Sequence, residues 1–356
     1  MKTIVLTGGG TAGHVTPNLA LLPALGEAGY RAVYIGSKDG IEKKLAEAAG
    51  LEFYGISAGK LRRYLAVKNV TDAFRVVKGM ADAVSVIRRV RPDVVFSKGG
   101  FVSEPVCLAA RLCGVPVVIH ESDMTPGLAN RLSFPFCKAA CVSFPETLKR
   151  LPRHLSGDKA VLTGEPIRRE LLSGDKEKGR GLCGFGGGKP VALFVGGSSG
   201  SARMNEQIRA ALDELLITFD VVHLCGRGNA ADIQKKGYAQ FEYLNEELPH
   251  VLALADVVAS RAGSGAIFEL LALRKPMLLI PLSKNASRGD QIQNARYFQR
   301  QGFAMLLYEE DMTAQTITDE LRSVYANRAC YTANMRKAAL PDAVGAVVEV
   351  IERFTK

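Results

Sequence analysis

The chain has 356 residues and a formal net charge of +10; 47% of its residues are hydrophobic and 23% are charged. A single hydrophobic core stops growing at about 250–300 residues, so this length predicts two domains. High apolar content with an ordinary charged fraction excludes a disordered chain. The positive charge favours an anionic partner, such as a phosphorylated substrate, an acidic membrane or a nucleic acid.

Much of this charge lies in one segment. Residues 60–91 contain nine lysines and arginines but only two aspartates. Apolar residues stand among the basic ones, a mixture typical of a segment that contacts an anionic membrane peripherally. An amphipathic helix packed on its own sheet, with a solvated basic face, is the alternative. Because aromatic residues are not interleaved with the basic ones, we expect no nucleic-acid partner.

The cysteines predict neither a metal site nor a disulfide framework. There are seven, scattered along the chain without a C-x-x-C pair, which is typical of free thiols in a reducing cytosol. No segment approaches the roughly 18 apolar residues of a membrane-spanning helix. The short apolar run Ile4–Leu6 predicts a core strand rather than a signal peptide.

Short apolar runs alternate with helical patterns in the first half of the chain. Strands are predicted at 3–7, 32–37, 93–100, 116–121 and 139–143. Helices are predicted between them, at 41–49, 70–90 and 104–113. Continuous apolar runs of this length are typical of parallel strands buried on both faces. The alternation therefore predicts an α/β domain with a doubly wound parallel sheet.

The pattern then restarts. Further strands are predicted at 190–200, 220–226, 241–244, 256–265 and 276–282. Gly164, Pro166 and a polar, glycine-rich stretch lie between the two sets of strands. We therefore expect domains at 1–163 and 164–340. A C-terminal helix within 341–356 could pack on either domain, the N-terminal one included.

Four strands are each followed by a glycine-rich turn and a helix. The turns lie at 8–13, 98–103, 196–201 and 261–265. A helix N-terminus presents unpaired N–H groups and about half a positive charge, and glycine lets the backbone approach an anion. Four such turns favour phosphate binding over a purely structural role as tight corners. In sheets of this kind, ligands bind beyond the carboxyl ends of the strands.

The first turn fits the G-x-G-x-x-G fingerprint of dinucleotide-binding proteins through Gly8, Gly10 and Gly13. A nicotinamide site also needs an acid at the end of the second strand to bind the ribose. Here that strand ends in Gly36 and Ser37. We therefore expect no nicotinamide cofactor.

His14 stands directly after the last glycine of this turn. An exposed imidazole with a pKa near 6.5 is suited to general-base catalysis, and a capping or packing role is the alternative. Thr16 is the predicted N-cap of the following helix, with Pro17 as its first residue. Pro23 is expected to kink that helix or shift its start.

The second half carries a denser set of polar residues. Glu269 follows the turn Gly263–Gly265 by about one helical turn, where it could bind the hydroxyls of a ribose whose phosphates lie on the turn. Three side chains that could bind sugar hydroxyls share one helix face further on: Asp290, Gln291 and Asn294. Arg168, near the domain boundary, could bind a phosphate through its guanidinium. The alternative is that these polar side chains lie at the surface and contact only solvent.

Several stretches, in order and over nearly the whole chain, resemble the MurG family of N-acetylglucosaminyltransferases, which convert undecaprenyl-pyrophosphoryl-MurNAc-pentapeptide (lipid I) to lipid II in peptidoglycan synthesis. They are GGGTAGHVTPNLAL, SKGGFVSEPVCLAA, HESDMTPGLANRL, TGEPIR, GGSSGSARMNE, SRAGSGAIFELLAL and SRGDQIQNA. The resemblance implies a GT-B fold of two Rossmann-like domains facing a central cleft. UDP-GlcNAc is then held mainly by the second domain. It also implies a peripheral enzyme on the cytoplasmic side of the cell membrane.

The family's functional positions can be transferred residue by residue. His14 falls on the family's proposed base, in a reaction that inverts the sugar carbon. The donor-binding positions are Thr11, Ala12, Gly13, Arg168, Ser198, Gly263, Ser264, Gly265, Glu269 and Gln291. Among them the resemblance assigns Glu269 to the ribose and Gln291 to the GlcNAc hydroxyls.

The sequence departs from the family in two places. Glu104 stands where many members have a small residue, and Glu121–Asp123 reads ESD instead of the commoner Glu-Gln-Asn. Asp123 is therefore not assigned to the donor.

The expected displacement needs one base, for which Glu121 is a second candidate. UDP leaves as an anion, which helix N-termini and Arg168 could stabilise. No D-x-D triplet occurs, so we expect no metal and no cofactor.

Three other functions share parts of this pattern. They are a glycosyltransferase that builds a glycolipid on diacylglycerol, an isomerase like UDP-GlcNAc 2-epimerase, and a non-catalytic sensor of sugar nucleotides. The acceptor used would distinguish the first, and release of a free sugar without an acceptor would distinguish the second. A sensor would keep its output when His14 is removed.

Overall fold

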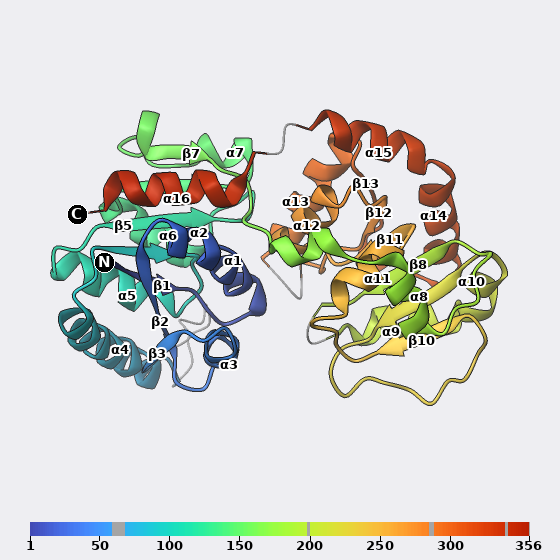
Figure 1. The fold of residues 1–356 in the computed structure, drawn as a ribbon, viewed down its shortest axis with the longest axis horizontal. Coiled ribbons are helices and arrows are strands. Elements are labelled where there is room, and N and C mark those ends of the chain that lie inside the picture. Colours follow the sequence, from blue (N-terminus) through green and yellow to red (C-terminus); the bar gives the residue numbers. More distant parts are fainter. Residues whose placement is uncertain (59–67, 198–199, 285–287, 339–340, 356) are drawn as a thin grey trace. The chain divides into compact units, whose positions relative to one another are not determined.

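The computed structural model describes residues 1–58, 68–197, 200–284, 288–338 and 341–355. The chain forms two compact units, one of Met1–Arg168 with Leu340–Lys356 and the other of Arg169–Ala339. The last helix, α16 (Ala343–Phe354), belongs to the first unit, and Figure 1 shows it in red beside the blue and green elements. Its buried face, which includes Val347 and Ile351, joins the same core as the first strand.

The first unit contains a seven-stranded sheet whose strand pairs are all parallel. In spatial order the strands are β3 (Glu52–Ile56), β2 (Tyr30–Ser37), β1 (Lys2–Thr7), β4 (Val94–Ser97), β5 (Val117–Glu121), β6 (Ala139–Val142) and β7 (Ala160–Leu162). Alternate residues of β1, such as Ile4 and Val5, enter different hydrophobic clusters. The sheet is thus buried on both faces, as the apolar runs predict.

Helices cover the two faces of this sheet. The unit contains α1 (Thr16–Ala20), α2 (Leu22–Glu27), α3 (Ile41–Ala48), α4 (Lys68–Val90), α5 (Ser103–Leu112), α6 (Leu128–Ser133), α7 (Pro145–Leu148) and α16. One cluster joins Leu25 of α2 to α16, and the other joins Ile87 of α4 to Val106 of α5. The sheet is therefore doubly wound.

The second unit repeats this plan with six parallel strands. Their order is β10 (Tyr238–Phe241), β9 (Asp220–Leu224), β8 (Val191–Val195), β11 (Val257–Ser260), β12 (Met277–Leu279) and β13 (Ala304–Leu306). The helices are α8 (Lys176–Cys183), α9 (Ala202–Ala210), α10 (Leu212–Thr218), α11 (Leu248–Leu254), α12 (Ser264–Ala272), α13 (Asp290–Arg300), α14 (Ala314–Ala326) and α15 (Arg328–Lys337). The prediction of two doubly wound parallel sheets is confirmed.

In both sheets the order in which successive strands are added reverses beside the first strand. The strands on either side of this switch point are β1 and β4 in the first unit, and β8 and β11 in the second. The four predicted glycine turns directly follow these four strands. Ligands of doubly wound sheets bind beyond the carboxyl ends of strands at such switch points. The fold therefore brings the turns together two by two.

Two local predictions are wrong. The strand predicted at 241–244 lies at Tyr238–Phe241, because its register with β9 ends at the pair Phe241–Leu224. The N-cap of α1 is Val15 rather than Thr16, because a 3₁₀ turn, Ala12–His14, already continues into Val15. The expected effect of Pro23 is confirmed, since the helix is interrupted at Leu21 and α2 restarts with proline in its first turn.

A buried ionic cluster, which we call the Lys98 cluster, joins the end of β4 to the segment after β7. The Lys98 ammonium lies 2.9 Å from Glu165 Oε1, and both side chains are almost fully buried. It also lies 2.8 Å from His120 Nδ1 and donates to Ser122 Oγ at 2.5 Å. Its three protons therefore each have a partner, as a buried charge requires.

The other members of the Lys98 cluster are also satisfied. Burial lowers the pKa of His120 to about 3, so the neutral ring donates from Nε2 to Gly164 O at 2.8 Å and accepts from Lys98 at Nδ1. Although burial opposes ionisation, the Lys98 charge holds the pKa of Glu165 below its usual value. Ser143 donates to the second oxygen of Glu165 at 2.7 Å. The cluster thus fixes where the chain leaves the first sheet.

Removing one partner of the Lys98–Glu165 pair should destabilise the first unit far more than removing both. Lys98→Met or Glu165→Leu leaves an unpaired buried charge, which costs about 3–5 kcal/mol, whereas the double replacement removes both charges. We expect the double variant to lose less free energy of unfolding than either single variant. The measurement is urea unfolding of the four proteins, with the first unit's transition fitted separately.

The exposed pair Lys43–Glu47, whose charged atoms lie 4.0 Å apart, provides the control. Its removal should change the free energy of unfolding by no more than about 0.5 kcal/mol. If the losses in free energy of unfolding of Lys98→Met and Glu165→Leu simply add in the double variant, the two buried side chains do not depend on each other.

Candidate active site

The two glycine turns of the first unit pack directly against each other. Gly10 has φ +90°, and a Cβ atom on it would lie 2.7 Å from the Phe101 ring. Gly100 has φ +85°, and its Cβ would overlap the carbonyl oxygen of Gly9. Glycine is needed at both positions for its positive φ and for the close approach. The turns after β1 and β4 therefore form one surface at the carboxyl edge of the sheet.

His14 ends the short 3₁₀ turn that follows the first glycines. Thr11 Oγ1 lies 2.9 Å from His14 Nδ1, and the His14 N–H donates to the Thr11 carbonyl oxygen at 3.2 Å. If His14 carries its proton on Nδ1 and donates it to the Thr11 hydroxyl, the lone pair of the ring is on Nε2. A general base that acts through Nε2 requires this tautomer. Ala12 and Gly13 lie inside this turn, so the structure brings together four of the predicted residues.

Glu121, the second candidate base, has another role in this geometry. It is 4% exposed, and burial raises its pKa to about 7. One of its oxygens accepts from Asp123 N at 3.0 Å, and the other accepts from Gly127 N at 2.9 Å and Asn130 Nδ2 at 2.8 Å. Both oxygens are thus used to hold the loop between β5 and α6. His14 remains the better-placed candidate.

Glu104 departs from the family pattern at the second position of α5. The side chain is half-buried, and burial raises its pKa. This position places an acid beside the turn that carries Phe101.

The turn after β11 opens directly into a helix. Gly263 is the N-cap of α12, and Ser264 and Gly265 form its first turn. All three are half-buried, and no side chain in the described part of the chain caps this helix. Its first N–H groups therefore have no capping side chain among the described residues, an arrangement that suits a phosphate.

Two other predicted donor residues lie near this turn. Gln291, in the first turn of α13, accepts from Leu282 N through Oε1 at 3.1 Å. Its Nε2 stands 4.0 Å from the position that a Cβ atom on Gly263 would occupy. Glu269 lies half-buried on α12, five residues after Ser264. The structure therefore brings Gln291 to the turn and places Glu269 on the helix that follows.

Asn294 does not join these residues, although the sequence places it on the same helix face as Gln291. It is fully buried, and its amide donates to the carbonyl oxygen of Ala262 at 3.3 Å. Asp290 lies 3.7 Å from Arg288 in an ion pair. Asn294 thus holds the loop before the turn and is inaccessible to a sugar.

Arg261 was missed by the sequence analysis and is central to this region. Its guanidinium forms a buried ion pair with Glu309 and donates to Ser201 Oγ at 2.5 Å and to Ile280 O at 3.1 Å. Ser283 N donates to the second Glu309 oxygen at 3.0 Å. Arg261 therefore ties the turn after β11 to the turn after β8 and to the segment after β12. The only signal in the sequence is an arginine directly after an apolar strand.

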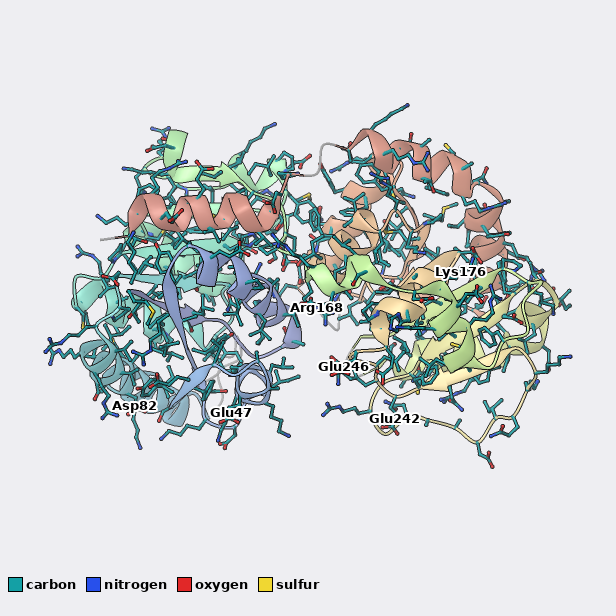
Figure 2. The ribbon with its side chains drawn as sticks, in the orientation of Figure 1. Glu47, Asp82, Arg168, Lys176, Glu242 and Glu246 are labelled. Carbon is teal, nitrogen blue, oxygen red and sulfur yellow. The ribbon has the colours of Figure 1, made fainter. Side chains whose placement is uncertain are left out.

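Two predicted donor residues are not placed at this site. Ser198 lies outside the described residues. Arg168 is half-buried and is the last residue of the first unit before the chain enters the second; Figure 2 labels it there. Within the described residues, no group of three or more His, Cys, Asp or Glu side chains could hold a metal ion.

The chain is similar to known glycosyltransferases. The model of the glycosyltransferase family 28 N-terminal domain matches residues 4–142, and that of its C-terminal domain matches residues 191–350. The UDP-N-acetylglucosamine--N-acetylmuramyl-(pentapeptide) pyrophosphoryl-undecaprenol N-acetylglucosamine transferase of Clostridium botulinum strain Langeland is 53% identical over 358 residues, 100% of both chains. The same-named protein of Clostridium tetani is 52% identical over 99% of this chain and 98% of its own.

Solved structures agree with these matches. MurG of Acinetobacter baumannii is 25% identical, has a TM-score of 0.75, and matches over 99% of this chain and 100% of its own. UDP-GlcNAc 2-epimerase of Neisseria meningitidis has a TM-score of 0.69 over 99% of this chain and 100% of its own, but at 13% identity it shows the fold alone. Both family models and the full-length relatives therefore show that the chain belongs to glycosyltransferase family 28 and, within it, to the MurG family.

Proposed function

We propose that this chain transfers N-acetylglucosamine from UDP-GlcNAc to the C4 hydroxyl of MurNAc in lipid I, with inversion at the sugar carbon, and so makes lipid II for peptidoglycan. One observation carries the proposal: relatives that are 53% identical over the full length of both chains bear the name of this transferase. The paired switch points of the two sheets support it, because they provide two separate sites at strand ends.

The donor is assigned mainly to the second unit, while Thr11, Ala12 and Gly13 of the first glycine turn are assigned to the donor sugar on the family's pattern alone. The N–H groups of Gly263, Ser264 and Gly265 at the start of α12 would bind the diphosphate, where the helix dipole favours an anion. Glu269 would accept from the ribose hydroxyls, and Gln291 would donate to the GlcNAc hydroxyls through the amide that faces Gly263. Arg168 and Ser198 belong to the same proposal on the family's pattern alone.

His14 is assigned as the general base. In the tautomer whose Nδ1–H donates to the Thr11 hydroxyl, Nε2 would accept the proton of the attacking C4 hydroxyl. The leaving UDP is stable as an anion, so it needs charge stabilisation from the first turn of α12 rather than a protonating acid. One base and one phosphate-binding helix end are then sufficient for the displacement.

Replacing His14 with Ala should slow transfer strongly and preserve donor binding. General-base catalysis contributes about 10²–10⁴-fold, so we expect kcat to fall in that range while the affinity for UDP stays unchanged. The assay incubates the protein with UDP-GlcNAc and a short-chain lipid I analogue and measures the disaccharide product. Calorimetry with UDP reports donor binding.

Controls without the lipid I analogue separate the alternatives. Release of UDP and N-acetylmannosamine without acceptor would identify an epimerase, and transfer to diacylglycerol would identify a glycolipid synthase. If the wild-type protein binds UDP-GlcNAc but forms no disaccharide, the proposed transfer is wrong.

Replacing Glu269 with Ala should weaken UDP binding, because a hydrogen bond to a charged group is worth about 1.5–3 kcal/mol. We expect the dissociation constant for UDP to rise by roughly 10- to 100-fold. Asp319→Asn, at an exposed position of α14, should leave the dissociation constant unchanged. Calorimetry compares the two variants, and an unchanged affinity of Glu269→Ala would remove Glu269 from the donor site.

We also propose that the segment 60–91 brings the enzyme to the cytoplasmic surface of the membrane as a peripheral protein. Residues 59–67 lie outside the described ones. Further along α4, Ala83 and Ile87 pack into the unit's own core, so this part of the helix does not insert. Its exposed basic side chains, Lys78, Arg88 and Arg89, support an electrostatic contact instead. In the described part of the chain, no helix combines the length and hydropathy needed to cross a bilayer.

Reversing the charge of Lys78, Arg88 and Arg89 to Glu should weaken binding to vesicles of anionic phosphatidylglycerol, since each basic group near the surface contributes about 1 kcal/mol. Vesicle sedimentation measures the bound fraction. The control reverses three exposed basic residues of the second unit, Lys236, Arg300 and Lys337. Equal loss in both triple variants would assign the binding to net charge rather than to α4.

A further inference from the structure

We propose that Glu42 is a positioning residue for His14, the proposed base. Its buried carboxylate lies inside the first glycine turn and occupies the place that a bound anion would take. The inference rests on the proposed function of His14 and adds a residue to it. It also distinguishes two turns that the sequence analysis treats alike. The turn after β1 would present His14, and only the turn at α12 would bind phosphate.

The Glu42 side chain connects three segments of the first unit. It lies in the first turn of α3 and is fully buried. Oε1 accepts from the Ser37 backbone N–H at 2.9 Å and from the Ser37 hydroxyl. Oε2 accepts from Gly10 N, in the middle of the glycine turn, at 3.3 Å. The carboxylate therefore joins the end of β2, the start of α3 and the turn after β1.

The backbone around this carboxylate is shaped to contain it. A Cβ atom on Gly9 would lie 2.7 Å from the carboxyl carbon of Glu42, and one on Gly36 would lie 2.6 Å from its Cγ. A Cβ on Gly40 would overlap the same carboxyl group. Glycines from three separate segments thus leave the space that one carboxylate occupies. A side chain at any of them would push Glu42 away from Gly10.

A carboxylate in this position changes what the turn can bind. It already accepts the Gly10 N–H, and its negative charge repels a phosphate brought to the same N–H groups. At α12, in contrast, no described side chain caps the helix N-terminus. We therefore infer that the Glu42 carboxylate takes the place of a bound phosphate at the first turn. This turn would then shape the backbone before His14 instead of binding a phosphate.

The far side of the same turn is also fixed. Tyr34 donates from its hydroxyl to Gly8 O at 2.7 Å, and Asn18 donates to Thr7 O at 3.2 Å. With Glu42 holding Gly10, the backbone is anchored on both sides before Thr11. Loss of the carboxylate would leave the N–H groups of Gly10 and Ser37 without this acceptor. The turn would then relax and shift Thr11 and His14, and a shift of about 1 Å in a catalytic group costs roughly 100-fold.

The test compares Glu42→Ala, Glu42→Gln and Glu47→Ala. Glu47 lies on the same helix with an exposed side chain, and Figure 2 labels it there. We expect Glu42→Ala to lower kcat by roughly tenfold or more, while the affinity for UDP stays unchanged because the proposed diphosphate and ribose contacts lie on α12. Formate should restore part of the rate of Glu42→Ala, since it supplies a carboxylate of the right size, and chloride should not.

Glu42→Gln provides the discriminating comparison. Its amide fills the same space, so formate has no room to bind, and an NH₂ group then faces an N–H of Ser37 or Gly10. We expect this variant to be slow and insensitive to formate. Glu47→Ala should match the wild type in rate and in its lack of response to formate.

A readout without turnover separates this inference from the proposed function. In NMR spectra of the histidine-labelled protein, the imidazole signals of His14, assigned with the His14→Ala variant, should shift in Glu42→Ala and return when formate is added. This holds even if the wild type fails to transfer GlcNAc, in which case only the proposed function is lost. Unshifted His14 signals in Glu42→Ala, or a loss of rate that formate leaves unaltered, would overturn the positioning role.

Discussion

Each unit depends on one buried ion pair at the carboxyl edge of its sheet. In the first, Lys98 and Glu165 join the end of β4 to the segment after β7. In the second, Arg261 and Glu309 join the turn after β11 to the segment after β13. A buried charge without its partner is costly, so each pair allows only arrangements that keep the connected loops together. The loops that carry the candidate site are therefore positioned by these buried charges, while His14, Glu269 and Gln291 themselves are only half-buried.

Neighbouring side chains explain why three of four similar turns differ in chemistry. All follow strands at a switch point and all are rich in glycine. The turn after β1 receives the Glu42 carboxylate, and the turn after β4 supplies Phe101, which lies against Gly10. The turn at α12 receives no side-chain cap within the described residues, which is why we propose it as the phosphate-binding turn. Glycine provides room in every case, and the neighbouring side chains decide what fills it.

The sequence predicts the centre of each sheet and misses its edges. The three strands that it does not predict, β3, β7 and β13, are all edge strands, and β10, which it displaces, is the fourth edge. Edge strands are short or partly exposed and lack the continuous apolar run on which the prediction rests. The turn residues are predictable because their signal is local. The partners of Lys98 and Arg261 are not, because Glu165 and Glu309 lie 67 and 48 residues away. For the same reason Asn294 is mistaken for a sugar ligand.

The position of His14 follows from the short helix in which it lies. In a 3₁₀ turn, side chains three residues apart stand above one another, so the spacing T-x-x-H brings the Thr11 hydroxyl to His14 Nδ1. The turn is short because α1 begins directly afterwards, with Pro17 in its first turn, where a missing N–H costs no hydrogen bond. Glu42 holds the backbone just before this turn, and α1 holds it just after. An imidazole carried by a three-residue turn between two fixed ends keeps its direction without being buried, which suits the role of general base that we propose for His14.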